Sequence, residues 1–106
     1  MIEVKSHARG RLHDRLGRLV SIQEVLSAVR VLESSIPSGD LETWVQVKKV
    51  QTVRMSEKTV GNIPVHGDTI WAVCFKAAQN APVRIVTVLV RHSAQPKMAG
   101  KIYLGG

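Results

Sequence analysis

The stretch Ser6–Leu16, SHARGRLHDRL, carries two rows of side chains at helical spacing. Ala8, Leu12 and Leu16 recur every four residues, so in a helix they form one apolar stripe that can pack inward. We therefore predict a helix that begins at Ser6, its N-cap residue, and ends near Leu16. A basic row runs beside the apolar stripe and consists of His7, Arg11 and Arg15.

The segment after this stretch predicts a second helix. Ser21 and Glu24 form the S-x-x-E capping box of a helix start. We expect this helix to end near Ser34, before a turn-rich loop at residues 36–42. Its apolar positions follow the spacing of a buried helix face and are Ile22, Val25, Leu26 and Val29.

The second half of the chain predicts strands. Residues 43–55 are rich in Val and Thr with imperfect alternation, which is typical of an exposed or edge strand. Residues 56–68, which include Gly61 and Pro64, predict a loop.

Two apolar runs, residues 69–77 and 83–92, predict central strands joined by an antiparallel hairpin. Residues 101–104 predict a short edge strand, and residues 1–5 a short strand or a lead-in. The order of elements predicts an α+β fold, with two N-terminal helices packed on a three- to four-stranded antiparallel sheet. At 106 residues, we expect a single domain over 1–106.

The charge balance favours an anionic partner. The chain has 15 Lys and Arg residues against 8 Asp and Glu, a formal net charge of +7. Nucleic acid is the commonest large polyanion that such a protein meets. Many small soluble proteins are also basic, so charge alone leaves both interpretations open.

The single cysteine and the distribution of apolar residues indicate a cytoplasmic protein. Cys74 excludes an intramolecular disulfide, and its apolar surroundings favour an inert buried thiol. The N-terminus lacks the apolar segment of a signal peptide, and no stretch approaches the ~20 apolar residues of a membrane span. We expect a cytoplasmic location without membrane association.

Several kinds of enzyme site are missing from the sequence. The four histidines are far apart, and there is no C-x-x-C or H-E-x-x-H pattern, so we expect no metal. There is no Walker loop, no G-x-G-x-x-G and no G-x-S-x-G elbow, so we expect no nucleotide cofactor and no acyl transfer.

Histidine with arginine suits metal-independent cleavage of RNA. The 2′-hydroxyl is an internal nucleophile, so the protein supplies a proton acceptor, a proton donor and cations around the phosphate. His7 is the candidate general acid or base, Arg11 and Arg15 are candidate phosphate ligands, and His92 completes the predicted catalytic set. Further candidates for nucleic-acid binding are Arg9, Arg18, Lys48, Lys49, Arg84 and Arg91.

A solvated ion-pair network is the alternative interpretation of the basic row. Asp14 lies within helical reach of Arg11 and Arg18, and exposed pairs of this kind contribute little to stability. Trp44 and Trp71 favour packing on the sheet over base stacking, because the chain has only four aromatic residues.

The opening of the chain resembles a group of small bacterial and phage domains. The pattern H-A-x-x-R-x-x-x-R at residues 7–15 precedes a capped helix, and strand matches follow at 67–73 and 84–88. The link between Arg15 and Ser21 is a few residues longer than the pattern has it. The group is similar to BrnT-type toxins, within the RelE/ParE-like superfamily.

This resemblance implies an α+β fold with helices against an antiparallel sheet. It also implies metal-independent ribonuclease activity on messenger RNA, although other members of the superfamily inhibit gyrase. An acidic antitoxin or host protein is the further partner it implies. The strongest rival is a basic module without enzymatic activity, which docks on an acidic host protein or holds nucleic acid uncleaved.

Overall fold

The chain folds into helices on one side of a five-stranded sheet. The computed structural model describes residues 1–60, 63–93 and 98–105. For Arg15 and for residues 52–60 and 63–66 it describes the backbone but not the side chains. The elements in order are β1 (Ile2–Val4), α1 (Ser6–Arg11), the π-helical turn η1 (Leu12–Leu16), α2 (Ile22–Leu32), the 3₁₀ turn η2 (Glu33–Ser35), β2 (Thr43–Val60), β3 (Ile63–Phe75), β4 (Val83–Arg91) and β5 (Ile102–Leu104).

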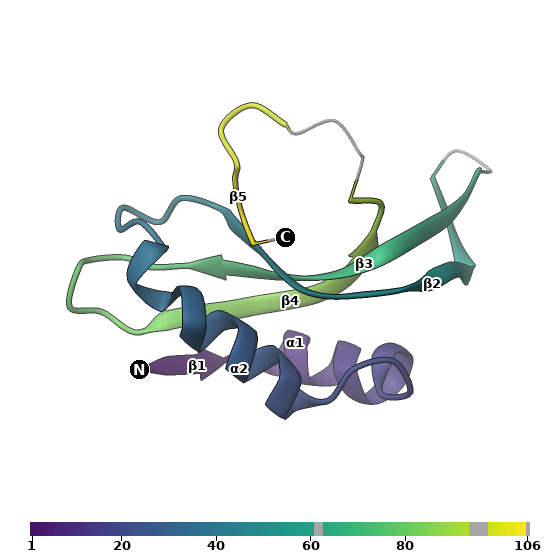
Figure 1. Ribbon diagram of the computed structural model, residues 1–106, viewed down its shortest axis with the longest axis horizontal. Helices are drawn as coiled ribbons and strands as arrows, with labels where there is room; N and C mark the ends of the chain where they lie inside the picture. The colour runs from purple at the N-terminus through teal and green to yellow at the C-terminus, as the bar shows by residue number, and fades with distance from the viewer. Residues whose placement is uncertain (61–62, 94–97, 106) are drawn as a thin grey trace.

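The sheet has the strand order β1-β4-β3-β2-β5 (Figure 1). β2, β3 and β4 form the antiparallel centre that the sequence predicts. The expected antiparallel sheet of three to four strands is nevertheless corrected to a mixed sheet of five. β1 pairs in parallel with Val83–Ile85, and β5 pairs in parallel with Thr43–Val45. Both added strands lie where the sequence predicts short ones, at residues 1–5 and 101–104. Each is three residues long and meets a partner far along the chain, so the sequence did not predict their parallel pairing.

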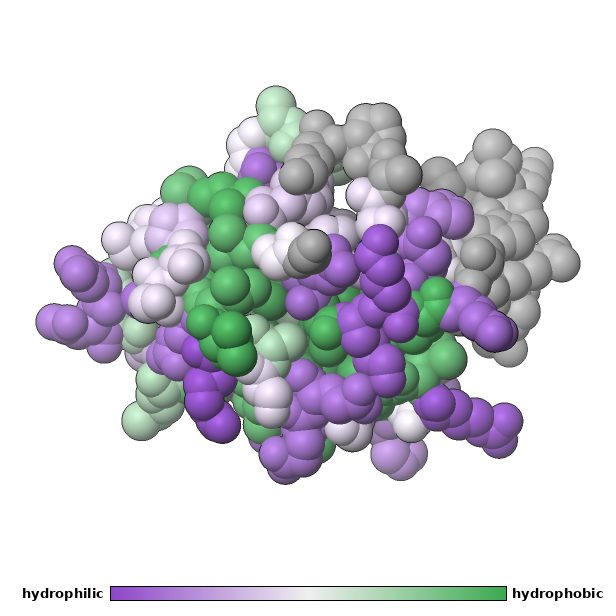
Figure 2. Space-filling view, in the orientation of Figure 1, coloured by the Kyte–Doolittle hydropathy of each residue, from purple (hydrophilic) through white to green (hydrophobic). Residues whose placement is uncertain are grey.

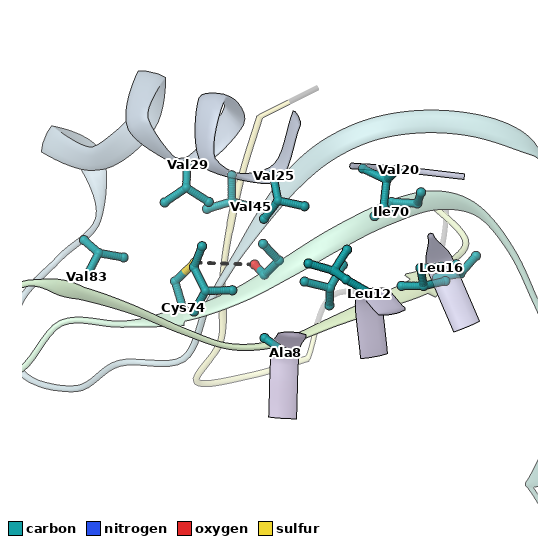
Figure 3. Close-up of a cluster of buried hydrophobic side chains, with 14 of the residues drawn as sticks. Ala8, Leu12, Leu16, Val20, Val25, Val29, Val45, Ile70, Cys74 and Val83 are labelled. Carbon is teal, nitrogen blue, oxygen red and sulfur yellow. Dashed lines mark hydrogen bonds between the residues drawn. The ribbon is translucent and has the colours of Figure 1, made fainter. Parts of the chain in front are cut away.

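The core lies between the helices and the sheet (Figure 3). Ala8, Leu12 and Leu16 are all buried, which confirms the apolar stripe that the first stretch predicts. The cluster of buried core residues is Ala8, Leu12, Leu16, Val20, Val25, Val29, Ile36, Val45, Ile70, Ala72, Cys74, Val83, Ile85, Val88 and Val90.

The first helix differs from its prediction at both ends. Its N-cap residue is Lys5, which makes no side-chain cap, and the expected N-cap Ser6 is the first helical residue. The α-helix ends at Arg11, and the chain continues to Leu16 as a π-helical turn. Capping chemistry at Ser6 was therefore misread, whereas the four-residue apolar period was read correctly.

The second helix begins as predicted. The Ser21 hydroxyl accepts a hydrogen bond from the Glu24 N–H, and the Glu24 carboxylate accepts one from the Ser21 N–H. This confirms the capping box. The α-helix ends at Leu32, and a 3₁₀ turn continues to Ser35.

Residues 56–68 were wrongly predicted to be a loop. β2 runs to Val60 and β3 starts at Ile63, so most of this segment forms a two-stranded arm (Figure 1). Gly61 lies outside the described residues. Proline has no backbone N–H to donate to a neighbouring strand. Pro64 is compatible with β3 because β4 pairs with β3 only from Thr69 onward, so no hydrogen bond to β4 is needed at Pro64. Among the described residues, no helix is long and apolar enough to cross a membrane.

Gly67 provides a test of how closely β3 approaches the end of β4. A Cβ atom at Gly67 would lie 2.3 Å from the Val90 Cγ1 atom and 2.7 Å from the Arg91 backbone N. Because the Arg91 backbone would have to move, we predict that Gly67→Ala lowers the free energy of unfolding by about 1–3 kcal/mol in urea titrations.

Gly10→Ala is the matched control. A Cβ at Gly10 would have no heavy atom within 4 Å, so this change should raise the free energy of unfolding by about 0.5–1 kcal/mol. Equal stabilities of the two variants would contradict the close approach at Gly67.

Candidate nucleic-acid interface

The basic side chains of α1 lie on both sides of its buried stripe. At 3.6 residues per turn, His7 and Arg11 fall on one side of Ala8, whereas Arg9 and His13 fall on the other. His7 and Arg9 are exposed, and Arg11 is half-buried. Of the predicted row of His7, Arg11 and Arg15, the structure therefore places the first two on the same side of the helix. Arg15 belongs to η1, and its side chain lies outside the described ones.

No described carboxylate compensates the positive charge of this row. The described Asp and Glu side chains all lie within ion-pair distance of groups elsewhere. None of these contacts involves His7, Arg9, Arg11 or Arg18. Asp14, the residue expected to neutralise the row, instead lies 2.9 Å from His13 Nδ1. Among the described side chains, the basic row thus carries its positive charge without an ion-pair partner.

Arg91 joins the row from the sheet. β1 covers only Val83–Ile85 of β4, and α1 packs against β4. The Arg91 guanidinium donates a hydrogen bond to the Val90 carbonyl at 2.8 Å. Burial lowers the pKa of Arg91, and the positive charge of Arg11 lowers it further. The fold therefore brings two guanidinium groups from distant parts of the chain within electrostatic reach of each other.

The other predicted binding residues divide into free and paired groups. Lys49 is exposed and shares a rung of the sheet with Thr69 and Arg91, so the three side chains lie on one face. Lys48 bonds the Glu24 carboxylate at 2.8 Å, and this hydrogen bond lowers the pKa of Glu24.

Arg84 is separated from the basic row. It forms an ion pair with Asp40 and lies seven residues before Arg91 on β4, or about 23 Å along the strand. Arg18, by contrast, is exposed just after η1. The structure thus brings Arg91 to Arg11 but does not bring Arg84 to either.

A shallow depression adjoins the other side of α1. It has a volume of about 250 Å³ and lies between Arg9 and His13 on one side and Ser21 and Ile22 on the other. The capping box already occupies Ser21, so this hollow presents the side chains of Arg9 and His13 rather than a free helix terminus.

His92 is held near a carboxylate at the end of β4. Its Nδ1 atom lies 3.9 Å from Asp68 Oδ2. Asp68 also accepts hydrogen bonds from the Ser93 N–H at 2.9 Å and the Thr69 hydroxyl at 2.8 Å. No hydrogen bond or ion pair between described groups joins His92 to His7, so its place in the catalytic set stays a prediction. Sequence reasoning missed Asp68, because an acid in a His-Gly-Asp run signals a turn.

The aromatic residues pack together on the sheet. The ring centroids of Trp44 and Trp71 are 6.0 Å apart, and the Tyr103 ring lies 5.7 Å from Trp44. Trp71 is buried, so its ring is not open for base stacking. This confirms the packing interpretation of Trp71. Tyr103 was not foreseen in this cluster, because only the pairing of β5 with β2 brings it there.

Cys74 is an inert thiol in this fold. It is buried, and burial raises its pKa to about 12, so it is protonated at neutral pH. Within the part of the chain that the structure describes, no group of three or more His, Cys, Asp or Glu side chains is placed to hold a metal ion.

Comparisons of this chain with protein-family models, curated proteins and solved structures found no match.

Asp68 anchors the residues that follow β4 through its hydrogen bond with the Ser93 N–H, and we expect this contribution to stability to be lost in acid. The backbone hydrogen bond from Ser93 is the main cause that lowers the pKa of Asp68. A lowered pKa in the folded state stabilises the fold above the unfolded-state pKa, and this contribution is lost as the pH falls through the folded value. We predict that Asp68→Asn lowers the melting temperature at pH 7, and that the difference from wild type vanishes well below pH 3.8.

Asp14→Asn is the control for this measurement, because Asp14 is exposed and its one ion pair with a described side chain is to its neighbour His13. Its melting temperature should follow that of the wild type at both pH values. If the melting temperature of Asp68→Asn were below that of the wild type by the same amount in acid, the carboxylate charge would not be what anchors the end of β4.

Proposed function

We propose that this chain binds RNA through His7, Arg11 and Arg91 and cleaves it without a metal. The observation that carries the proposal is that the half-buried Arg11 and Arg91, on the packed elements α1 and β4, have no described carboxylate within ion-pair distance of either. Two like charges that are partly buried together raise the free energy of the free protein, and a bound anion relieves that cost. A phosphate group suits this position, because a guanidinium donates two parallel hydrogen bonds to phosphate oxygens.

His7 supplies the acid–base chemistry in this proposal. It lies one helical turn before Arg11, on the same side of α1, and is exposed to substrate. An imidazole can exchange protons near neutral pH. His7 takes the proton of the 2′-hydroxyl, whose oxygen attacks the adjacent phosphorus, and the 5′ oxygen leaves with a proton from solvent. Arg11 and Arg91 stabilise the charge that develops on the phosphate oxygens.

Other predicted residues extend this surface. Arg15 follows Arg11 by four residues along the same chain segment, and Arg18 follows η1. Lys49 lies on the rung of Arg91. In the proposal these residues bind neighbouring phosphates, whereas Lys48 and Arg84 stabilise the fold through their ion pairs.

The proposal agrees with the RelE/BrnT-like resemblance of the first helix. Two helices that precede three antiparallel strands, β2, β3 and β4, are consistent with the arrangement that the resemblance implies. Because one fold can serve different activities, the proposed cleavage rests on the side chains and not on this likeness.

Binding without cleavage is the second candidate function. It is favoured by the surroundings of His7, which is exposed and has no hydrogen bond to a described side chain that would orient its ring. A general base usually has such a partner. The same basic surface would then hold RNA, or an acidic protein, without chemistry.

The test is incubation of the purified protein with labelled single-stranded RNA in EDTA. We predict products with 2′,3′-cyclic phosphate ends and a loss of about 10²–10⁴-fold in rate for His7→Ala. His13→Ala is the matched control, because His13 is exposed on the other side of the same segment and should retain the wild-type rate.

Binding is measured in the same samples by titration of the RNA at several salt concentrations. Intact RNA bound with a salt slope of about −0.7 per phosphate contact would favour the second candidate. Intact RNA with no binding at low salt would contradict both cleavage and RNA binding, and would leave only the docking of an acidic protein.

A further inference from the structure

Over most of its length, the outer edge of β2 has no strand partner among the described residues. β5 pairs only with Thr43–Val45, and Gly105 approaches Gln46. Beyond this point, the described part of the sheet offers β2 no neighbour except β3. The register with β3 also shifts between Gln46 and Lys48, so Val47 is an extra residue outside the ladder. Backbone groups left unpaired in this way are available to another chain.

An apolar groove borders this edge. It has a volume of about 430 Å³ and lies between α2 and β2. Figure 2 shows hydrophobic surface over α2 and toward β2, bordered by hydrophilic side chains. Val31 is 80% exposed, which is unusual for a valine on a helix whose other valines are buried in the core. The residues that line the groove are Gln23, Glu24, Ser27, Ala28, Val31 and Val47.

The groove and the edge together fit an extended segment of a protein. A strand added to β2 would pair with its outer backbone and direct every second side chain toward Ala28 and Val31. A helix in the same groove would leave the outer backbone groups of β2 unpaired.

Charge identifies the kind of segment. The chain carries a formal net charge of +7, and exposed Lys49 follows Val47 closely on the edge. A second copy of this chain would bring the same positive charge to the edge and be repelled. An acidic segment of a different protein would be attracted.

We propose that the outer edge of β2 and the α2–β2 groove bind an extended, acidic segment of a partner protein by strand addition. The segment alternates apolar residues, which enter the groove, with residues that face away from it. Lys49 is the one residue of this edge that is also assigned to RNA. The residues that line the groove are not, so the proposal does not rest on the proposed function.

The experiment selects a displayed library of random 12-residue peptides against the full chain. We expect acidic peptides with alternating apolar residues, and slower hydrogen exchange at the amides of residues 46–49 when a selected synthetic peptide is bound. Val31→Glu should weaken its binding at least tenfold and leave the melting temperature unchanged, because Val31 is exposed.

Ser38→Glu is the matched control, since it adds the same charge at an exposed position outside the groove. Arg11→Ala should bind the peptide like wild type, which separates this surface from the basic row. Recovery of no peptide, protection confined to other residues, or equal binding by Val31→Glu would overturn the proposal. Self-association through residues 46–49 in sedimentation would overturn it in favour of a second copy.

Discussion

The packing of the first helical segment against β4 is the contact on which the rest of the structure depends. Ala8, Leu12 and Leu16 are nearly inaccessible to solvent and face the sheet (Figure 3). Full burial of a leucine side chain contributes about 1.5–3 kcal/mol. The same contact fixes the rotation of α1 about its axis. Once the apolar stripe is buried, His7 and Arg11 have to lie along one border of the contact with β4.

Electrostatics explains why this border is a candidate site. Some described cations meet carboxylates, as Lys48 meets Glu24 and Arg84 meets Asp40, and others, such as Arg30 and Lys49, are exposed to solvent. At Arg11 and Arg91 the neighbouring charge has the same sign. A protein that only needed stability would gain from an acid at this place, and this is the physical argument for the proposed anion site.

The second surface follows from topology rather than charge. β5 is three residues long and ends the sheet early, which leaves the outer side of β2 open beside α2. The exposed valine on α2 and the bulged valine on β2 border the same groove. The chain thus presents a basic border at α1 and an open edge at β2.

The sequence predicted those features that depend on local spacing. Three such features were predicted: the capping box of Ser21 and Glu24, the buried stripe of Ala8 and Leu12, and the antiparallel centre of the sheet. Each depends on residues that are close together in the chain. It could not predict the parallel pairing of β1 and β5, because three residues carry no recognisable period. The arm at 56–68 was missed because Gly61 and Pro64 are typical of a loop, whereas the part of β3 that holds Pro64 has no pairing with β4 and so tolerates proline.

The candidate site was predictable in part for the same reason. His7 and Arg11 share a helix face by spacing, so the sequence places them together. The approach of Arg91 depends on where α1 packs, and the pairing of Lys48 and Arg84 depends on contacts with distant acids. Neither could be inferred before the chain was folded.

The central claim is that Arg11 and Arg91 act as one anion site, and nuclear magnetic resonance of the arginine side chains tests it most directly. Labelled protein is titrated with a short single-stranded RNA, and the guanidinium Nε–H signals are assigned from Arg→Lys variants. The account predicts that the Arg11 and Arg91 signals shift together, at the same RNA concentrations, whereas the signal of Arg30 on α2 stays in place. Shifts at Arg30 and not at Arg11 and Arg91, or shifts of these two at clearly different RNA concentrations, would contradict it.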